Sequence, residues 1–433
     1  MEKEKEKEKD TGDSAARFRA WILRAWIPRA RILRTWMKIA YVAGFAWEPK
    51  GTVRSRAFPL AVEMARRGHE VTLLIAPYDN LLHSGRRFVS EGVRVINLEI
   101  SGRGALALAR LPRQFLDLID RIAPDLVHVF KPKGLAGMTA MALLDRGYRA
   151  LVVDCDDWEG WGGWNEVSRY PWVLKEFIDL EERWLVCNVP VVTAASRVLA
   201  HRARDLGKMP DRVFYVPNGI SQEQADSASS RTTNMPPDRK RALGFSERPL
   251  ILYAGHFDAV DDVPFFCRAA APAALHHGAT IALLGDGPGL GAARQFFSSL
   301  EDLPVRYLGQ LPYGEYAQFV AACDVATFPY PDHPVYRAKC SARIIDYMAF
   351  GKPILTTAVG QNMEYLVDGE SGILTASGDE KAYGAGLDEL LRDGDLRARL
   401  GENARRRLLD NFLWSGRAGD ECEKAYTLAA GLC

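Results

Sequence analysis

The segment KCSARIIDYMAFGKP, residues 339–353, has the residue types of a binding site. It starts with charged residues, continues as a short amphipathic run and stops at Gly-Lys-Pro, as a helix that ends on a ligand would. Asp346 lies on a helical face otherwise made of Ile, Met and Phe. The simpler interpretation is an exposed helical Asp that pairs with Arg343, three residues earlier.

Two other places could supply polar groups to a ligand. His128 ends the buried run LVHVF, and a histidine there could donate to a ligand oxygen and would titrate near neutrality. It could equally be a structural histidine with satisfied hydrogen bonds. In the loop EPKGTVR (48–54), the backbone amides of Gly51 and Thr52 precede a helix and could face an acceptor or a phosphate.

These residues lie between short apolar runs that alternate with amphipathic stretches. KIAYVAG (38–44) is an apolar run that ends in glycine, as buried parallel strands do. The next amphipathic stretch has helical spacing from Phe58 to Ala65, and Gly68 closes it. Alternating β and α units predict an α/β protein with doubly wound parallel sheets. The other expected strands are EVTLLIA, VRVINLEI, LVHVF, ALVVDC, VPVVTAAS, RVFYVP, LILYAG, TIALLGDG, VRYLG, VATFPY, PILTTAVG and GILTA.

The series of β and α units occurs twice. The first occupies residues 37–219, and the Ser/Thr/Pro-rich stretch 220–248 lacks an apolar period and is expected to be a linker. The second occupies 249–410, and a helical tail follows over 411–433. Because ligands bind at the carboxyl ends of parallel strands, two such edges facing each other would form a deep cleft.

Composition limits the classes of protein. The chain has 56 Lys and Arg against 55 Asp and Glu, so its net charge of +1 gives no general attraction to nucleic acid or membrane. Its 7 cysteines are scattered without a Cys-x-x-Cys pair, which disfavours a disulfide framework and a structural zinc site. No apolar run is long and clean enough to span a bilayer. These features predict a soluble cytoplasmic protein.

The first 36 residues differ from the rest of the chain. MEKEKEKEKD is a charge run expected to stay solvated and disordered. Residues 16–36, ARFRAWILRAWIPRARILRTW, form a basic apolar segment that could lie on the inner face of an anionic membrane, although Pro28 interrupts any single helix. Alternatively, Met37 is the natural start and the extension is dispensable.

The second series resembles the donor half of the retaining family-4 glycosyltransferases (glycosyl transferases group 1) of the GT-B fold. The resemblance rests on ILYAG, LLGDGPG (283–289), VRYLGQLPYGEYAQFVAACDVATFPY (305–330) and DYMAFGKPILTTAVGQNMEYLVDGESGIL (346–374). In the first series PDLVHVF, TAASR and VPNGI match in order and spacing. The resemblance implies a GT-B fold, in which two Rossmann-like domains face each other across a cleft. The first would be the acceptor domain and the second the nucleotide-sugar donor domain.

The chemistry implied by the resemblance is transfer of a sugar from a nucleotide-sugar to an acceptor hydroxyl, with retention at the anomeric carbon. The leaving diphosphate must be neutralised, the ribose fixed and the acceptor hydroxyl aligned, so positioning and electrostatics dominate. No metal or other cofactor is expected, because helix N-termini and basic side chains bind the diphosphate.

The resemblance also implies a donor site. Asp346 stands at the second position of the family's E-x7-E pair, whose carboxylate accepts hydrogen bonds from the ribose hydroxyls. The stretch just before it delivers backbone amides to the phosphates, and Arg343 and Lys339 are expected to hold the diphosphate. The full predicted set is Gly255, His256, Gly285, Lys339, Ser341, Arg343 and Asp346.

The chain departs from the family pattern at two points. Ala338 stands where the first acid of the pair belongs. The Arg and Lys that clamp the diphosphate in the family are replaced by His256 and by Asp261 or Asp262. A carboxylate near a diphosphate is unfavourable. Either other basic groups replace the clamp, or the donor is unusual, or the protein does not turn over.

The acceptor side is expected from residues 44–56, 128–134 and 154–168, with Gly51, Thr52 and Trp158 as binding residues and His128 near the reacting centre. Trp158 could stack on a sugar or could pin its loop. The segment DCDDWEGWGGWNE also carries Asp-x-Asp, the metal motif of the other large glycosyltransferase fold. That fold has one nucleotide-binding sheet rather than two, so no metal site is expected.

The sequence therefore predicts a cytoplasmic retaining glycosyltransferase. Its expected partners are a nucleotide-sugar donor, a lipid-linked or saccharide acceptor and, through residues 16–36, a membrane surface, but no nucleic acid. A catalytically silent GT-B subunit that binds a nucleotide or a partner enzyme is the alternative favoured by the two departures. A sugar-nucleotide epimerase is a third option, but it is disfavoured because residues 346–374 resemble the family-4 glycosyltransferases.

Overall fold

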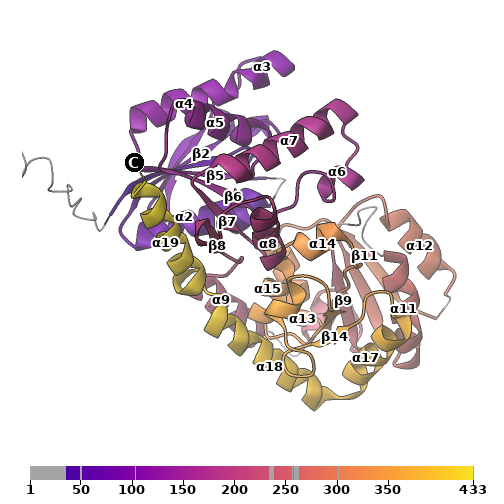
Figure 1. Cartoon of the computed structure of the whole chain (residues 1–433). Coiled ribbons are helices and arrows are strands. Elements are labelled where there is room, and N and C mark those ends of the chain that lie inside the picture. The colour runs from indigo at the N-terminus through magenta and orange to yellow at the C-terminus, as the bar shows by residue number, and fades with distance from the viewer. Residues whose placement is uncertain are drawn as a thin grey trace, which may run out of the picture. The chain divides into compact units, whose positions relative to one another are not determined.

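The computed structural model describes residues 36–48, 51–102, 104–233, 238–255, 257, 263–300 and 302–432 (Figure 1). The predictions for residues 1–35 and for His256, Asp261 and Asp262 lie outside the described residues. From Lys38 onward the chain forms one compact unit. In the described part of the chain, no helix combines the length and the apolar character needed to cross a bilayer.

The first domain is built on a sheet of 8 strands in the order β3-β4-β2-β1-β5-β6-β7-β8. Every neighbouring pair is parallel except β3 and β4, which run antiparallel. The sequence analysis missed β3, because this edge strand is largely exposed and has no apolar run. The strands are β1 (Lys38–Ala43), β2 (Glu70–Ile75), β3 (Arg87–Ser90), β4 (Val93–Asn97), β5 (Leu126–Phe130), β6 (Leu151–Cys155), β7 (Val191–Ala194) and β8 (Val213–Tyr215).

Helices and short helical turns connect these strands. Amphipathic α2 begins at Phe58 with a proline in its first turn and ends before Gly68, which adopts a positive φ of 94°. Among the others, α4 packs on α5 and α5 on α7. The elements are η1 (Val53–Ala57), α2 (Phe58–Arg66), η2 (Leu81–His83), α3 (Ala105–Ala109), α4 (Leu111–Ile122), α5 (Gly134–Asp145), α6 (Trp164–Val167), α7 (Trp172–Asn188), α8 (Arg197–Asp205) and η3 (Pro210–Arg212).

The second domain has a fully parallel sheet of 6 strands in the order β11-β10-β9-β12-β13-β14. Its central strands are buried along their whole length, which explains their near-continuous apolar sequences. The strands are β9 (Leu250–Ala254), β10 (Thr280–Leu284), β11 (Val305–Gly309), β12 (Val325–Phe328), β13 (Ile354–Thr357) and β14 (Ile373–Thr375). The helices are α11 (Val263–His276), α12 (Leu290–Ser298), α13 (Tyr313–Ala322), α14 (Pro334–Ala338), α15 (Ala342–Ala349), α16 (Asn362–Tyr365), α17 (Glu380–Arg392) and α18 (Gly394–Asn411). The predicted fold class is confirmed for both domains.

Two segments link the domains. Where the sequence suggested a linker over 220–248, the structure has α9 (Gln222–Thr233) and α10 (Arg239–Ala242). The apolar face of α9 consists of small side chains, with Ala225 and Ala228 buried, so its sequence shows little hydrophobic period. After α18 the chain returns beside the first crossing, where Ile220 and Leu413 form a parallel bridge. It ends in η4 (Trp414–Ala418) and α19 (Gly419–Ala430), which contacts β5, β6, β7 and β8 of the first domain.

Candidate active site

A cleft of about 470 Å³ lies where the carboxyl ends of strands from both sheets meet. Its wall on the first domain comes from the start of η1 and the loop after β6, and its wall on the second from the loops after β9, β10 and β11 and from the start of α15. The cleft gathers most of the predicted site: Gly51, Thr52, Gly255, Gly285, Lys339, Ser341, Arg343 and Asp346. A larger cavity between α11 and α17 has none of these residues in its lining.

Two glycines let the loops after β9 and β10 come together at the floor of the cleft. Gly285 has a φ of 125°, and a Cβ there would lie 1.8 Å from the carbonyl oxygen of Gly255. Gly287 has a φ of 151°, and its Cβ would lie 2.4 Å from the carbonyl oxygen of Phe257. Only residues without a side chain fit both the backbone conformation and this approach. The predicted pair Gly255 and Gly285 therefore contributes backbone surface to the cleft.

The N-terminus of α15 faces this space. Ser341 caps the helix with an extended backbone, and the following amides and the helix dipole favour an anion at this end. The ammonium of Lys339 lies 5.7 Å from the ring centre of Trp164, 5.3 Å from that of Tyr336 and 5.9 Å from that of Tyr330. Aromatic faces attract a cation, so these rings hold Lys339 at the edge of the cleft.

Arg343 lines the cleft from the first turn of α15. Its guanidinium carbon lies 5.5 Å above the ring of Phe328. The ion pairs found in the described part of the chain do not include one between Arg343 and Asp346. The simple surface-pair interpretation of Asp346 is therefore wrong, and the guanidinium is directed by packing on Phe328.

Asp346 is half-buried in the cleft wall. The hydroxyl of Tyr313 donates to its Oδ1 at 3.3 Å. Burial raises the pKa of Asp346 to about 7, although the hydrogen bond from Tyr313 and the nearby charge of Arg343 oppose this. The carboxyl group of Asp346 therefore titrates near pH 7, and hydrogen bonds donated by bound hydroxyl groups would favour its charged form.

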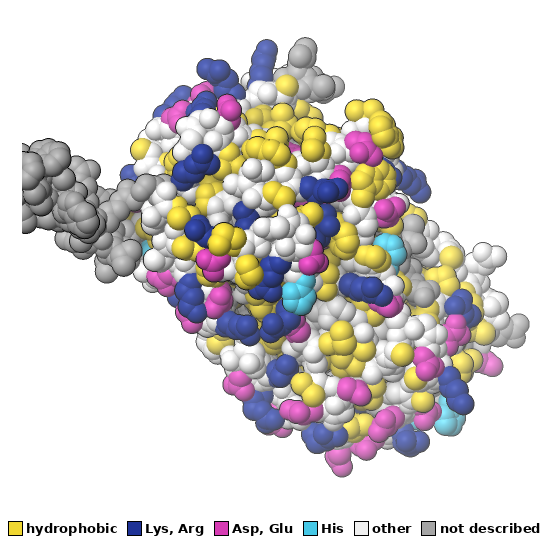
Figure 2. Space-filling view, in the orientation of Figure 1, with side chains coloured by type: hydrophobic (Ala, Val, Ile, Leu, Met, Phe, Trp, Pro, Cys, Tyr) yellow, Lys and Arg dark blue, Asp and Glu magenta, His cyan; other side chains and the backbone are white. Residues whose placement is uncertain are grey.

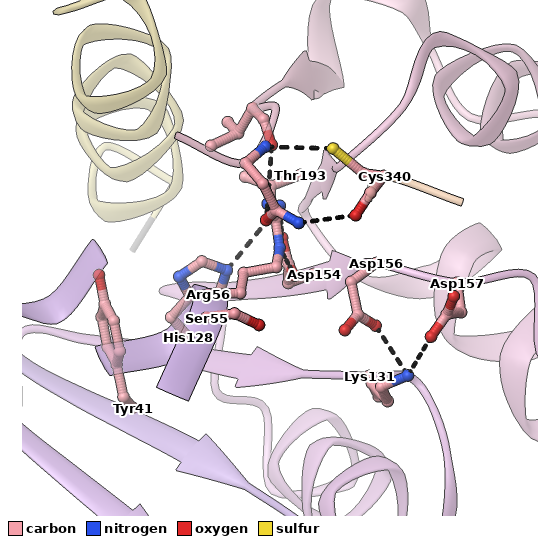
Figure 3. Close-up of polar contacts among 12 residues, drawn as sticks. Tyr41, Ser55, Arg56, His128, Lys131, Asp154, Asp156, Asp157, Thr193 and Cys340 are labelled. Carbon is pink, nitrogen blue, oxygen red and sulfur yellow. Dashed lines mark hydrogen bonds and ion pairs between the residues drawn. The ribbon is translucent and has the colours of Figure 1, made fainter. Parts of the chain in front are cut away.

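On the first domain, the acids of DCDDWEG are paired with cations. The ammonium of Lys131 lies 2.5 Å from Asp157 Oδ2 and 3.3 Å from Asp156 Oδ1 (Figure 3). It also lies 3.0 Å from Glu159 Oε1. Lys133 lies 2.6 Å from the other oxygen of Glu159. The three carboxylates are close enough together to hold a metal ion, but the Lys131 ammonium already lies among them. The residues present therefore fit a lysine rather than a metal.

The first acid of the Asp-x-Asp run has another partner. Asp154 and Arg56, both fully buried, form two hydrogen bonds of 2.6 Å each. Thr193 donates to Asp154 Oδ1 at 2.6 Å. Arg56 also donates to the carbonyl of Val216 at 2.9 Å and to Asn218 Oδ1 at 3.0 Å. Arg56 was not predicted from the sequence. The signal that could have found it is the combination of an arginine just before a helix with an aspartate near the end of a buried strand.

Asn218 connects the Arg56–Asp154 pair to the second domain. Its side-chain amide donates to the carbonyl of Cys340 at 2.9 Å, and its backbone N–H donates to Cys340 Sγ at 3.3 Å. Tyr365 donates to the carbonyl of Asn218 at 2.8 Å. Figure 3 shows the continuous path from Asp154 through Arg56 to Cys340. Because Cys340 lies between Lys339 and Ser341, a buried network of the first domain helps to position the approach to α15.

The prediction of His128 as a catalytic residue is corrected by its surroundings. The ring is fully buried, and its Nε2 lies 3.2 Å from Thr193 Oγ1 (Figure 3). Its Nδ1 lies 2.7 Å from the hydroxyl of Tyr426. Burial lowers its pKa to about 3, so it stays neutral. It is absent from the lining of the cleft. Helix α19, almost three hundred residues away in sequence, supplies the Tyr426 that satisfies this histidine.

Trp158 also lies away from the cleft lining. The guanidinium of Arg202 stacks 4.2 Å from its ring, and a Cβ added to Gly163 would lie 2.5 Å from one of its ring atoms. The side chain therefore pins its own loop against α8 instead of presenting a face to a sugar. Trp164 approaches the cleft instead, through its contact with Lys339.

Comparisons with known proteins agree with this architecture. Residues 51–219 match the family model of the glycosyl transferase 4-like domain, and residues 248–393 match that of glycosyl transferases group 1. The chain is 30% identical over 225 residues to a D-inositol 3-phosphate glycosyltransferase of Stackebrandtia nassauensis, covering 49% of this chain and 48% of the relative. It thus spans about half the length of that relative.

Two further similarities extend over most of the chain. The lipopolysaccharide core biosynthesis glycosyltransferase LpsE of Rhizobium meliloti is 24% identical over 351 residues, covering 81% of this chain and 88% of the relative. The structure of Anabaena HepE in complex with UDP-glucose superposes with a TM-score of 0.66 at 17% identity, covering 89% of this chain and 98% of that chain. With both domain models matched in this order, on two facing parallel sheets, the chain belongs to the GT-B glycosyltransferases, with a glycosyl transferase 4-like domain followed by a glycosyl transferases group 1 domain.

Proposed function

We propose that this protein is a glycosyltransferase that moves a sugar from a nucleotide-sugar to an acceptor hydroxyl and retains the anomeric configuration. The observation that carries the proposal is the convergence, in one cleft, of a poised carboxylate, a helix N-terminus and two cations. A nucleoside diphosphate carries a diol at one end and two phosphates at the other. The cleft offers a partner for each.

The donor is proposed to lie along α15. Asp346 accepts hydrogen bonds from the two ribose hydroxyls, and Tyr313 orients its carboxylate. The diphosphate meets the N-terminal amides of α15, with Arg343 and Lys339 on either side. These groups are fixed before the reaction, so they stabilise the charge that develops on the leaving phosphate without reorganisation.

In the transfer step, the bond from the anomeric carbon to the β-phosphate oxygen breaks, and the leaving diphosphate keeps the electron pair. A new bond forms from the acceptor oxygen to the same face of that carbon, and the acceptor proton passes to the leaving oxygen. Gly51 and Thr52, which line the opposite wall, are proposed to face the acceptor. Positioning of the two reactants across the cleft lowers the barrier, because the step no longer requires a chance encounter.

The acceptor is proposed to be a hydroxyl of a saccharide or a lipid-linked glycoconjugate. Supporting this, the relative from Rhizobium meliloti is named for lipopolysaccharide core biosynthesis, and the one from Stackebrandtia nassauensis is named for an inositol phosphate. The pairing of charges on the acceptor wall also fits an acceptor that presents hydroxyl groups. Lys131 and Lys133 pair with the three acids there, leaving a polar surface suited to hydroxyl groups.

One observation favours the alternative of a silent nucleotide-binding subunit. Ala338, which replaces the first acid of the family pair, is fully buried, and its carbonyl accepts a 2.6 Å hydrogen bond from Ser196. No carboxylate reaches the sugar from this position. A protein that kept only the nucleotide contacts would bind the donor without transferring the sugar.

Turnover of the donor separates the two functions. Purified protein is incubated with a panel of nucleotide-sugars, and slow release of the nucleoside diphosphate is followed without acceptor. We expect release with at least one donor, loss of release in Asp346→Ala, and by NMR an anomer of unchanged configuration. If calorimetry showed that the protein binds a nucleotide but no nucleotide-sugar released its diphosphate, the silent subunit would be favoured. An inverted anomer would overturn retention.

A further inference from the structure

Helix α7 exposes a large apolar face, although Ile178, Leu185 and Val186 on its other side are buried. Six of its large apolar side chains are exposed, including Trp172 at 68%, Val173 at 72% and Leu180 at 62%. Val173, Phe177, Leu180 and Trp184 are spaced by four, three and four residues, so they share one outward face. Figure 2 shows hydrophobic side chains gathered where α6 and α7 lie.

Three acidic residues of α7, Asp179, Glu181 and Glu182, are buried on its inner side. Glu182 accepts from the backbone N–H groups of Glu159 and Gly160 at 3.0 Å each, and Asp179 accepts from that of Trp161 at 2.9 Å. Glu181 accepts from the N–H of Gly134 at 2.6 Å. These bonds fix the rotation of α7 about its axis, because turning the apolar face inward would leave buried amides without acceptors. The outward apolar face is thus built into the fold.

Basic side chains outnumber acidic ones at the edge of this face: exposed Arg169 and Arg183 and half-buried Lys175 stand against exposed Glu166 and half-buried Glu176. Arg183 lies beside Trp184, and its guanidinium is 3.6 Å from the carboxylate of Asp179. Exposed Glu166 is engaged by the N–H of Gly162 at 3.0 Å. Aromatic residues stand at both ends of the face, as is common for groups at a membrane–water interface.

We propose that this face of α7, defined by Trp172, Val173, Phe177, Leu180 and Trp184, docks on an anionic lipid surface. The apolar side chains enter the headgroup region, and Arg169 and Arg183 meet lipid phosphates. The loop held by Glu182 and Asp179 continues directly from Asp156 and Asp157 in the cleft wall, so a docked α7 brings the acceptor wall close to the lipid. The inference does not depend on the transfer reaction.

Charge favours a lipid surface over a second copy of this chain. In a two-fold dimer through this face, the same patch would meet itself, and the arginine rim of one copy would lie against that of the other. Like charges across an interface are unfavourable, whereas an anionic leaflet complements them.

Vesicle binding tests the proposal on the full chain. The protein is sedimented with vesicles of pure phosphatidylcholine or of phosphatidylcholine mixed with phosphatidylglycerol. The variant Val173→Glu/Leu180→Glu should lose binding to the mixed vesicles on the order of tenfold or more, because two carboxylates replace inserted apolar groups. The matched control is Leu82→Glu/Val89→Glu, at positions 78% and 71% exposed but on η2 and β3. It should bind as the wild type does.

Two results would overturn the proposal. One is equal vesicle binding by the α7 variant and the wild type, which would assign membrane contact to another segment such as residues 16–36. The other is a wild-type dimer in solution that the α7 variant makes monomeric, which would show that a second copy covers the face. Analytical ultracentrifugation without vesicles reads out the second result.

A spin label at Cys187 gives an independent readout. This thiol is exposed on the same side of α7, while the other cysteines of the described residues are buried. In a Cys433→Ser background, the label should become less accessible to a water-soluble relaxation agent and more accessible to oxygen on mixed vesicles. A label that stays fully water-accessible on those vesicles would also contradict docking through this face.

Discussion

The two walls of the cleft handle charge differently. On the second domain, the cations Arg343 and Lys339 lie against aromatic rings, and Asp346 is bonded only weakly to a tyrosine hydroxyl. On the first domain, Lys131 and Arg56 lie against carboxylates at 2.5 and 2.6 Å. The wall on the second domain therefore positions its two cations at the cleft by packing on rings, whereas the wall on the first domain uses its charges in ion pairs that hold the fold together.

Breaking the buried pair of the first domain should give the largest effect. Arg56→Ala leaves Asp154 buried without its partner, which typically costs about 3–5 kcal/mol of the free energy of unfolding. We expect a large fall in the midpoint of urea unfolding. The control is the double variant Arg56→Met/Asp154→Leu, which removes both charges and should recover part of the loss. A single variant as stable as the wild type would show that this wall does not depend on the pair.

Removing Asp346 should act on binding rather than on stability. In Asp346→Ala the two ribose hydroxyls lose a charged acceptor, a loss of about 1.5–3 kcal/mol. This corresponds to roughly 10–150-fold in the dissociation constant for a nucleoside diphosphate measured by calorimetry. The urea midpoint should stay close to that of the wild type. If the variant bound the nucleoside diphosphate as tightly as the wild type, Asp346 would not belong to the donor site. The wall on the second domain would then lose its proposed role in binding a charged ligand.

His128 should behave as part of the fold. His128→Ala breaks the bonds to Tyr426 and Thr193 and leaves a cavity in place of a fully buried ring, at a cost of about 1–3 kcal/mol in stability, although each hydroxyl keeps one other partner. At temperatures where the variant is folded, donor turnover should match the wild type and show an unchanged pH profile. A fall in kcat without a fall in stability would restore the catalytic interpretation.

The pH dependence of donor binding should follow Asp346. Its pKa is raised to about 7 from an ordinary value of 3.8, so the carboxylate is lost as pH falls through about 7. Affinity for a nucleotide should therefore weaken below neutrality, by up to about tenfold per pH unit. Binding by Asp346→Asn should lack this step, since the amide does not titrate. A parallel fall in both proteins would assign the step to the ligand phosphate or to another group.

The smallest effects are expected for the two cations of the second wall. Arg343→Ala and Lys339→Ala each remove one partly exposed charge, about 0.2–1 kcal/mol of interaction. Each should weaken a nucleoside diphosphate more than the monophosphate, because only the former reaches both cations. Arg343→Lys serves as a control that keeps the charge and loses the planar fork. Equal losses for both nucleotides would show that neither side chain contacts the second phosphate.

How far the sequence predicted the site depends on the sequence distance between interacting groups. Lys339, Ser341, Arg343 and Asp346 fall within eight consecutive residues, so helical geometry alone placed them on one end of α15. Gly255 and Gly285 follow strands of one parallel sheet, and strand ends of such a sheet share an edge. These predictions needed only local rules and topology.

The misplaced residues had partners far along the chain. His128 was expected at the cleft edge, but Tyr426 of the C-terminal helix covers it. Trp158 was expected in the cleft wall, but Arg202 of α8 packs on it. In both cases the residue type was compatible with a structural and a functional role, and burial decided between them. No local pattern contains that information.

The sequence by itself determined the two doubly wound sheets, because buried parallel strands require continuous apolar runs and their connections require helical periods. It also determined the donor segment, whose residues are neighbours in one helix. Tertiary structure alone decided which partner each charged side chain has. Asp154, Asp156 and Asp157 read alike in DCDD, yet one binds Arg56 and the other two share Lys131. The exposure of the apolar face of α7 was decided in the same way, because its acids are held by backbone amides of the loop at residues 159–161. The physical reason is that the pairing of a charge depends on what the fold brings within a few ångströms of it, and sequence spacing does not report that distance.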